Sequence, residues 1–322
     1  MKKVLVTGAT GFIGQALIEC LFKGGFEITA ATRQSASLLP VHVRQVEVGN
    51  LLPDTDWSSA LLGIDVVIHL AARVHVMNDE SSDPLVEFRK INTQGTLNLA
   101  RQAAELNVSR FIYLSSIKVN GETTKPNEPF DEHISVAPTD PYGLSKYLAE
   151  QGLREIAKQT MMDAVIIRPP LVYGPNVKAN FHTMMKWLHR GIPLPLGAII
   201  HNQRSLVALE NLVHLIKTCI EHPNAANQTF LVSDDEDLST TELLRRLASS
   251  LGKPSYLISV PAYLLTTATT LLGKRNLIQR LCGSLQVDIS HTKQILNWSP
   301  PVSVTDALQK TADSYLKQLE KK

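Results

Sequence analysis

The chain contains 322 residues, of which 44% are hydrophobic and 19% are charged, and its formal net charge at pH 7 is +2. This length is enough for a complete α/β core with a second lobe. The nearly balanced charge excludes a strongly basic surface of the kind that binds nucleic acid or an acidic membrane. The three cysteines are too few and too widely spaced for a disulfide framework or a metal site, so we expect a cytoplasmic protein without a metal.

The first fourteen residues predict a strand, a tight turn and the start of a helix. The apolar residues 4–6 lead into Gly8, Gly11 and Gly14, which are spaced three apart. Glycine at 8 permits the turn, glycine at 11 lets the backbone approach a pyrophosphate, and glycine at 14 lets the helix pack against the strand. Free N–H groups at the start of the helix would face the phosphates, so the pattern predicts a bound dinucleotide.

Strand and helix patterns alternate along the first half of the chain. Predicted strands cover residues 4–6, 28–32, 43–48, 66–70, 110–115 and 164–167, and predicted helices cover residues 14–22, 88–106 and 142–157. This alternation is typical of a Rossmann-type α/β fold, in which helices cover both faces of a doubly wound parallel sheet. A helix over residues 209–220 and a strand over residues 229–232 are expected to return to that sheet.

The sequence predicts two lobes. Residues 1–175 form the dinucleotide-binding domain, to which residues 205–232 return, and residues 176–204 and 233–310 form a smaller, mainly helical substrate lobe. Residues 311–322 form the tail, of which the charged residues 315–322 are expected to fray. The uncharged residues 254–273 predict a packed helix of that lobe. The alternative is a helix lying in a membrane interface beside Lys274 and Arg275, although Pro261 argues against a span and membrane contact is not expected.

Two further patterns carry chemistry. Tyr142 and Lys146 stand four residues apart in a predicted helix and therefore share one face. A nearby ammonium stabilises a phenolate, so the pKa of Tyr142 is expected to fall toward neutral pH. Ser115 and Ser116 end an apolar strand at the carboxyl edge of the sheet, where ligands bind, and either hydroxyl could orient a substrate oxygen.

Together these patterns resemble the extended short-chain dehydrogenase/reductases, in particular the nucleotide-sugar epimerases, dehydratases and reductases of the UDP-glucose 4-epimerase type. The matching stretches are residues 7–14, 65–72, 92–96, 115–116, 142–146 and 168–175. The resemblance implies a catalytic triad of Ser116, Tyr142 and Lys146, with Ser116 placed by counting back from Gly121. It implies hydride transfer at C4 of a nucleotide sugar, with a UDP-hexose as the expected substrate. In this mechanism Tyr142 moves the hydroxyl proton, Ser116 orients that oxygen, and Lys146 lowers the pKa of Tyr142 and holds the ribose.

The resemblance also implies a set of binding residues. The expected cofactor contacts are Gly8, Thr10, Gly11, Phe12, Ile13, Arg33, Asn50, Leu51, Leu70, Ala71, Ala72, Tyr142, Lys146 and Arg168. The expected substrate contacts are Ser116, Lys118, Asn180 and Arg204. Asn180 and Arg204 match the positions that hold the diphosphate, and the arginine fork suits phosphate oxygens. The alternatives are that Asn180 caps a helix and that Arg204 is a solvated surface charge.

The end of the second predicted strand bears on the identity of the cofactor. A carboxylate there would hold the ribose 2′-hydroxyl of NAD, but this chain has Arg33 and Ser35. These two side chains suit a 2′-phosphate, so we expect NADP. The alternative is that Arg33 stacks on the adenine and NAD binds. Asn50 stands where the family often has an acidic residue near the adenine.

Other departures from the family pattern bear on the reaction. Leu171 replaces an asparagine that 4-epimerases often have, and Asn120 replaces an aromatic residue. Ile117 and Lys118 replace the acidic pair that a dehydratase needs, so dehydration is not expected. A 4-keto-sugar reductase and a 4-epimerase both remain open.

Two other classes of function remain as alternatives. One is an oxidoreductase of a non-nucleotide carbonyl or hydroxyl substrate, and the other is a non-catalytic NADP-binding protein. The resemblance also implies a homodimer formed through the helix that carries Tyr142.

Overall fold

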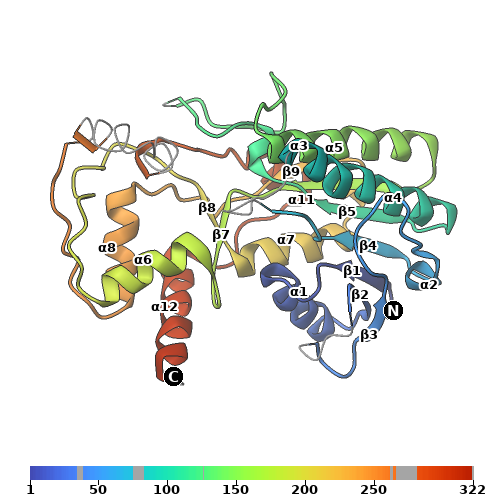
Figure 1. Ribbon diagram of the computed structural model, residues 1–322, viewed down its shortest axis with the longest axis horizontal. Coiled ribbons are helices and arrows are strands. Elements are labelled where there is room, and N and C mark those ends of the chain that lie inside the picture. The colour runs from blue at the N-terminus through green and yellow to red at the C-terminus, as the bar shows by residue number, and fades with distance from the viewer. Residues whose placement is uncertain (35–38, 75–82, 126, 262–263, 266–280, 321–322) are drawn as a thin grey trace.

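The structure is a computed structural model that describes residues 1–34, 39–74, 83–125, 127–261, 264–265 and 281–320. One half of the molecule is a parallel sheet between two layers of helices, and the other half is a smaller group of helices (Figure 1). The sheet contains seven strands in the order β3-β2-β1-β4-β5-β6-β9. They are β1 (Lys3–Thr7), β2 (Glu27–Thr32), β3 (Arg44–Glu47), β4 (Val66–His69), β5 (Arg110–Leu114), β6 (Asp163–Arg168) and β9 (Thr229–Leu231).

The inner strands are buried on both faces, as a parallel sheet covered by helices requires, whereas the edge strand β3 is largely exposed. All four residues of β4 are buried, and so are four of the five residues of β1. β1 pairs with β2 on one side and with β4 on the other, so the strand order reverses direction at β1. In such sheets a ligand binds in the crevice beyond the carboxyl ends of the strands at this reversal. The predicted doubly wound fold is therefore confirmed.

The helices form layers on both faces of the sheet and a separate group beside it. They are α1 (Phe12–Lys23), α2 (Ser58–Leu61), α3 (Pro84–Phe88), the π-helix η1 (Arg89–Gly95), α4 (Thr96–Glu105), η2 (Ile117–Val119), α5 (Pro141–Gln159), α6 (Ala179–His189), α7 (Leu209–Glu221), η3 (Pro223–Ala225), α8 (Thr240–Ser250), α11 (Ser290–Leu296) and α12 (Val304–Glu320). α1 and α7 pack together on one face of the sheet, while α4 and α5 cover the other.

The predicted helix over residues 88–106 is in fact three consecutive segments, α3, η1 and α4. The middle segment is a π-helix, which holds more residues per turn than an α-helix and occurs frequently at functional sites. The π-helix ends at Gly95, which packs closely against Leu51. Glycine is needed there, because a Cβ at Gly95 would lie 2.9 Å from the Leu51 carbonyl oxygen. Periodicity alone did not reveal this insertion, since the apolar spacing resumes in α4.

A hydrophobic cluster separate from the two faces of the main sheet holds the second half of the chain together. It joins α6, α8 and α12 with the short parallel pair β7 (Leu171–Tyr173) and β8 (Leu206–Ala208). The buried side chains of residues 285–298 instead pack with the cluster of α1, α7 and the main sheet. This segment of the predicted substrate lobe is therefore anchored on the dinucleotide-binding half.

One sequence-based expectation for the second half is wrong, and another is wrong in its first part. The tail expected to fray from residue 315 is helical in α12 as far as Glu320, and Tyr315 is buried there. The expected helix over residues 254–273 does not begin at Pro254, because residues 256–258 are extended and exchange backbone hydrogen bonds with residues 194–197. Residues 262–263 and 266–273 lie outside the described residues. Within the described part of the chain, no helix is long and apolar enough to cross a membrane.

Leu215 offers a test of the packing between α7 and the sheet. Its side chain is fully buried, so Leu215→Ala should lower the free energy of unfolding by about 2–5 kcal/mol, because it removes apolar contacts and leaves a cavity. Leu62→Ala is the matched control, since Leu62 is 69% exposed and its truncation should change that free energy by less than about 0.5 kcal/mol. Chemical unfolding of both variants would contradict the packing described here if the two losses were equal.

Candidate active site

The glycine turn after β1 is packed too tightly for any side chain. Gly8 has a φ of +69°, and a Cβ there would lie 2.8 Å from the Ala71 nitrogen. A Cβ at Gly14 would lie 2.2 Å from the Gly8 carbonyl oxygen. Gly11 is the N-cap of α1 and provides no side chain to bond the first N–H groups of that helix. A helix start of this kind, with its donors left for an anion, fits a pyrophosphate.

The other expected cofactor contacts lie around this turn at the carboxyl edge of the sheet. Thr10 and Gly11 are exposed, and Phe12 and Ile13 are half-buried at the start of α1. Leu70, Ala71 and Ala72 follow β4 directly and are half-buried, and the Ala71 N–H donates to Thr7 Oγ1 at 3.2 Å. The part of the site that would receive the dinucleotide is thus built from β1, α1 and the end of β4.

Three expected contacts stand at the ends of β2 and β3. Arg33 follows β2 directly and is exposed, while Ser35 lies outside the described residues. Asn50 is exposed after β3, and its carbonyl accepts a hydrogen bond from Thr55 Oγ1 at 2.6 Å. Leu51 is half-buried and packs against η1. The two exposed residues described directly after β2 are the cation Arg33 and the amide Gln34, and neither is a carboxylate.

The three expected catalytic side chains meet at the carboxyl end of β5. Ser116 is the N-cap of η2, where its hydroxyl oxygen accepts from the Lys118 N–H at 3.3 Å, and its side chain lies close enough to Tyr142 to lower the pKa of the phenol. Tyr142 lies in the first turn of α5, where the ring of Phe88 packs edge-on against it at 5.9 Å. Lys146 is buried one turn further along α5, and its Nζ donates to the Leu114 carbonyl at 2.9 Å.

Burial dominates the electrostatics of this cluster. It raises the pKa of Tyr142 to about 12; the hydrogen bond from Ser116 opposes this shift and the nearby Asp140 carboxylate adds to it. Burial also lowers the pKa of Lys146 to about 7, while the Glu150 carboxylate opposes that shift. The expected fall in the pKa of Tyr142 is therefore wrong, because loss of water around the phenol outweighs the opposing effect of Ser116.

Ser115 and Ser116 are distinguished by their partners. Ser115 is buried, and its hydroxyl donates to Glu150 Oε1 at 2.6 Å. Ser116 is half-buried and lies close enough to Tyr142 to lower the pKa of its phenol. The serine that acts on the phenol is thus Ser116, whereas Ser115 fixes the strand end to α5.

Arg168 has a structural role that the sequence did not predict. Its side chain has no exposed surface and forms an ion pair with Glu150 at 2.7 Å. The remaining guanidinium nitrogen donates to Asn120 and to the backbone of Glu132. Protein acceptors surround both ends of the guanidinium, which gives the side chain a structural role, and the cofactor contact stays a prediction.

The expected substrate contacts come from three separate elements. Lys118 lies on η2 and pairs with Glu122 at 3.0 Å and with Asp140 at 3.2 Å, so neighbouring carboxylates partly neutralise its charge. Asn180 is exposed in the first turn of α6, whose N-cap is Lys178, so Asn180 does not cap this helix. Arg204 precedes β8, and its guanidinium donates to the Gly283 carbonyl at 3.0 Å.

Sequence reasoning missed two sets of buried polar contacts, one that joins β1 to α4 through His69 and one that joins η1 to α5 through Asn92. His69 has no exposed surface and bonds through Nδ1 to Thr7 Oγ1 at 2.7 Å and through Nε2 to Thr96 Oγ1 at 2.9 Å. Burial lowers the pKa of His69 to about 3, so the ring stays neutral. Asn92 on η1 bonds to the backbone of Arg73 and to the hydroxyl of Ser145 on α5. The stretches 65–72 and 92–96 carried the family resemblance, but the sequence alone gave these side chains no role.

One group of side chains has the composition of a metal site. Ligand atoms of Asp131, Glu132 and His133 lie within 4.8 Å of one another. Asp131 and His133 are exposed, and Glu132 also pairs with His291 at 3.5 Å. We assign no metal to this group, because exposed acidic groups commonly occur without one.

The fold and this arrangement of residues define the class of protein. The chain belongs to the NAD-dependent epimerase/dehydratase family, whose model matches residues 4–233. It is 48% identical to UDP-glucose 4-epimerase of Vibrio cholerae, over 98% of this chain and 96% of that protein. It is 26% identical to an N-acetyl-α-D-glucosaminyl-diphospho-undecaprenol 4-epimerase of Escherichia coli O157:H7, over 96% of this chain and 93% of that protein.

Solved structures share the fold across nearly the whole chain. UDP-glucuronic acid 4-epimerase from Bacillus cereus in complex with NAD matches with a TM-score of 0.76 and 23% identity, covering 98% of this chain and 99% of that one. UDP-N-acetylglucosamine 4-epimerase from Bacillus cereus matches with a TM-score of 0.79 and 20% identity, covering 99% of this chain and 100% of that one. The resemblance to extended short-chain dehydrogenase/reductases is thus confirmed.

The contrast between the two serines can be tested by titration. Ser116→Ala should raise the pKa of Tyr142 above its value in the unmodified protein, because it removes a hydrogen bond that favours the phenolate. Ser115→Ala should leave that pKa unchanged, since its hydroxyl bonds to Glu150. NMR of ring-labelled tyrosine, with Tyr142→Phe used to assign the signal, measures both. Equal shifts in the two serine variants would show that the assignment of Ser116 is wrong.

Proposed function

We propose that this protein transfers hydride at C4 of a nucleotide sugar, with a UDP-hexose as substrate, and that the net reaction is 4-epimerisation. The meeting of Ser116, Tyr142 and Lys146 at the carboxyl end of β5, beside the glycine turn, carries the proposal. The 48% identity to UDP-glucose 4-epimerase of Vibrio cholerae over 98% of this chain supports the choice of substrate and reaction.

The residues of the turn fit a nicotinamide dinucleotide. Gly8, Gly11 and Gly14 would hold its pyrophosphate at the start of α1, and residues 70–72 would border it on the side of β4. When bound, the nicotinamide supplies the hydride acceptor and donor.

The chain's own residues handle the proton of the C4 hydroxyl. When C4 is oxidised, Tyr142 takes this proton in the fraction of molecules in which the phenol has lost its own, and the hydroxyl of Ser116 holds the sugar oxygen in place. When the keto group is reduced on the other face, Tyr142 returns the proton to the same oxygen. The elevated pKa of Tyr142 suits the second step, because the phenol carries its proton at neutral pH.

A second candidate is a 4-keto-sugar reductase, in which only the reducing half of this chemistry occurs. Tyr142 would give its proton to the keto oxygen, and a reduced dinucleotide would be consumed. The observation in its favour is Arg33, an exposed cation at the end of β2. A carboxylate in that place suits NAD, whereas a cation suits the 2′-phosphate of NADPH, the usual reductant in such reactions.

One experiment separates these functions. Purified protein is given a panel of UDP-hexoses and UDP-4-keto-hexoses, and NADPH and NADH absorbance is followed together with NMR of the products. Interconversion of C4 epimers without net loss of cofactor supports the epimerase, and net loss supports the reductase. Turnover of small non-nucleotide carbonyls alone would replace both, and no turnover of any substrate would leave a non-catalytic dinucleotide-binding protein.

Tyr142→Phe tests the proposed proton transfer. The variant should lose turnover by a factor of about 10²–10⁴, because it removes the group that moves the proton. The dissociation constant of the dinucleotide should change little, since the ring remains in place. Tyr147→Phe, on the same helix, is the matched control and should keep full turnover. A Tyr142→Phe variant with normal turnover would exclude this mechanism.

Arg33→Asp tests the choice of dinucleotide. We propose that Arg33 gives the site a preference for NADP over NAD, although the family description and the NAD-containing structural neighbours favour NAD. Fluorescence titration should find tighter binding of NADPH than of NADH in the unmodified protein, and Arg33→Asp should reverse the order, because a carboxylate repels the 2′-phosphate and accepts from a 2′-hydroxyl. Gln34→Asp is the control for added charge. Equal affinities in the unmodified protein would overturn the assignment.

We also propose a reducing compartment, the cytoplasm, and a homodimer formed through α5. Cys20, Cys219 and Cys282 are all unpaired, which supports the compartment. The family resemblance supports the dimer, and size-exclusion chromatography with light scattering measures it.

A further inference from the structure

Arg168 on β6 joins the catalytic helix α5 to the loop of residues 131–133. It is the last residue of β6, next to the end of β5, and its side chain is fully buried. Nε and Nη2 bond to the two oxygens of Glu150 at 2.9 and 2.7 Å. Nη1 points the other way and donates to Asn120 Oδ1 at 3.1 Å and to the Glu132 carbonyl at 3.0 Å. A planar guanidinium can hold two such partners in a fixed relative position.

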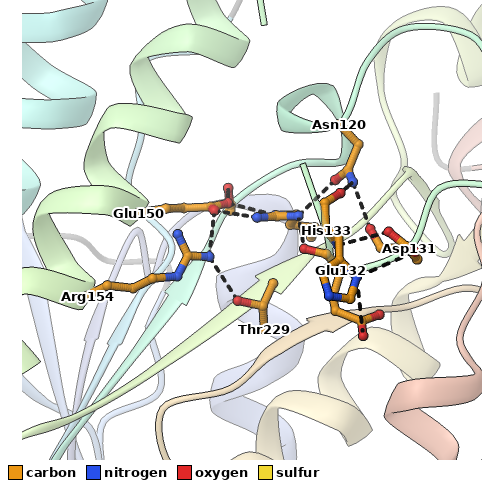
Figure 2. A network of polar contacts seen from close by, with 9 residues as sticks. Asn120, Asp131, Glu132, His133, Glu150, Arg154 and Thr229 are labelled. Atoms are coloured by element: carbon orange, nitrogen blue, oxygen red, sulfur yellow. Dashed lines mark hydrogen bonds and ion pairs between the residues drawn. The ribbon is translucent and has the colours of Figure 1, made fainter. Parts of the chain in front are cut away.

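On one side the guanidinium of Arg168 fixes the catalytic residues relative to one another through Glu150. Glu150 lies on α5 one turn after Lys146 and also accepts from the hydroxyl of Ser115. Ser115 is bonded directly to Ser116, so a single carboxylate joins the helix of Tyr142 to the strand end of Ser116. Arg154 adds a further bond to Glu150 at 3.1 Å and links it to Thr229 (Figure 2).

On the other side the guanidinium of Arg168 holds the loop of residues 131–133, which belongs to the dinucleotide-binding half of the sequence. Asn120 Nδ2 donates to the carbonyls of Asp131 and His133 at 2.7 and 3.0 Å. With the bond from Arg168 to Glu132, three consecutive carbonyls of this loop are held by two side chains (Figure 2).

Backbone hydrogen bonds connect the segment before this loop to residues 284–288. Phe130 pairs with residues 286–288, and Thr124 pairs with Ser284. Leu285 in turn pairs with Gln203 and Ser205, the two neighbours of Arg204. Arg204 is the residue expected at the sugar diphosphate. A continuous set of bonds thus runs from the catalytic helix to the segment that carries Arg204.

We infer that Arg168 and Asn120 are positioning residues that set the substrate half of the site against the catalytic triad, with Asn120 as the link to residues 131–133. This inference rests on the proposed function, because the position it sets is that of a nucleotide sugar. The two residues act on substrate binding through the loop and do not touch the reacting atoms.

Asn120→Ala is the direct test, because it removes two of the three bonds to the loop and leaves the ion pair of Arg168 with Glu150 intact. The KM for the nucleotide sugar should rise about tenfold, while kcat and the dissociation constant of the dinucleotide change by less than about twofold. Asn120→Asp should give the same rise, since it keeps the acceptor for Arg168 but loses both donors to the loop. Glu128→Ala, an exposed position on the same loop, is the control and should leave KM unchanged. An unchanged KM in both Asn120 variants overturns the inference, whatever happens to their melting temperatures.

Arg168→Lys extends the test to the buried fork. A lysine can keep one bond to Glu150 but cannot also reach Asn120 and Glu132. Arg110→Lys is the matched control, because Arg110 bonds to Asp163 and to three carbonyls at the opposite edge of the same strands. Both variants should melt at lower temperature, and only Arg168→Lys should raise KM. A rise of KM in both variants would show that Arg168 contributes only to stability, which would contradict its role as a positioning residue.

Hydrogen exchange provides a readout that does not depend on the substrate. Asn120→Ala should speed exchange at the amides of Phe130, Leu285 and Asp288, and Glu128→Ala should not. If no nucleotide sugar is turned over by the unmodified protein, the proposed function fails while the exchange data still decide the linkage. Unchanged exchange at residues 284–288 in Asn120→Ala would overturn the inferred link between Asn120 and this segment.

Discussion

The buried ion pair between Glu150 and Arg168 is the interaction on which the rest of the site depends. Taking two charges out of water costs several kcal/mol for each ion, which the pair offsets only when further hydrogen bonds complete both groups. Here Ser115 completes the carboxylate and Asn120 completes the guanidinium. The pair is therefore stable in one arrangement of α5, β5 and β6, and that arrangement is the one that brings Ser116 to Tyr142.

Burial also decides which protons the site can move. The pKa of Tyr142 lies above and that of Lys146 lies below the usual value, so at neutral pH the tyrosine holds its proton and the lysine is close to losing its own. His69 is neutral for the same reason, and a neutral imidazole can donate through one nitrogen and accept through the other. The link from Thr7 through His69 to Thr96 therefore persists throughout the neutral range.

Local patterns in the sequence were enough for the fold and for part of the site. Gly8, Gly11 and Gly14 specify the turn by their spacing, and Tyr142 with Lys146 share a helix face in any helix. The choice between Ser115 and Ser116 needed the resemblance, and its physical basis lies in Glu150, which is distant in sequence. The role of Arg168 and the direction of the Tyr142 pKa shift could not be predicted, because both depend on burial and on partners from several elements.

The π-helix η1 between α3 and α4 limits which insertions and deletions this part of the chain can accept. Each residue turns an α-helix by about 100°, so the residues within η1 set the angle at which α4 meets the sheet. Leu99, Ala100 and Ala103 are the buried face of α4, and Asn92 and Thr93 reach α5 from η1 itself. Loss of a single residue from 89–95 would rotate one of these two sets away from its partners. The length of this segment is therefore as strongly constrained as its composition.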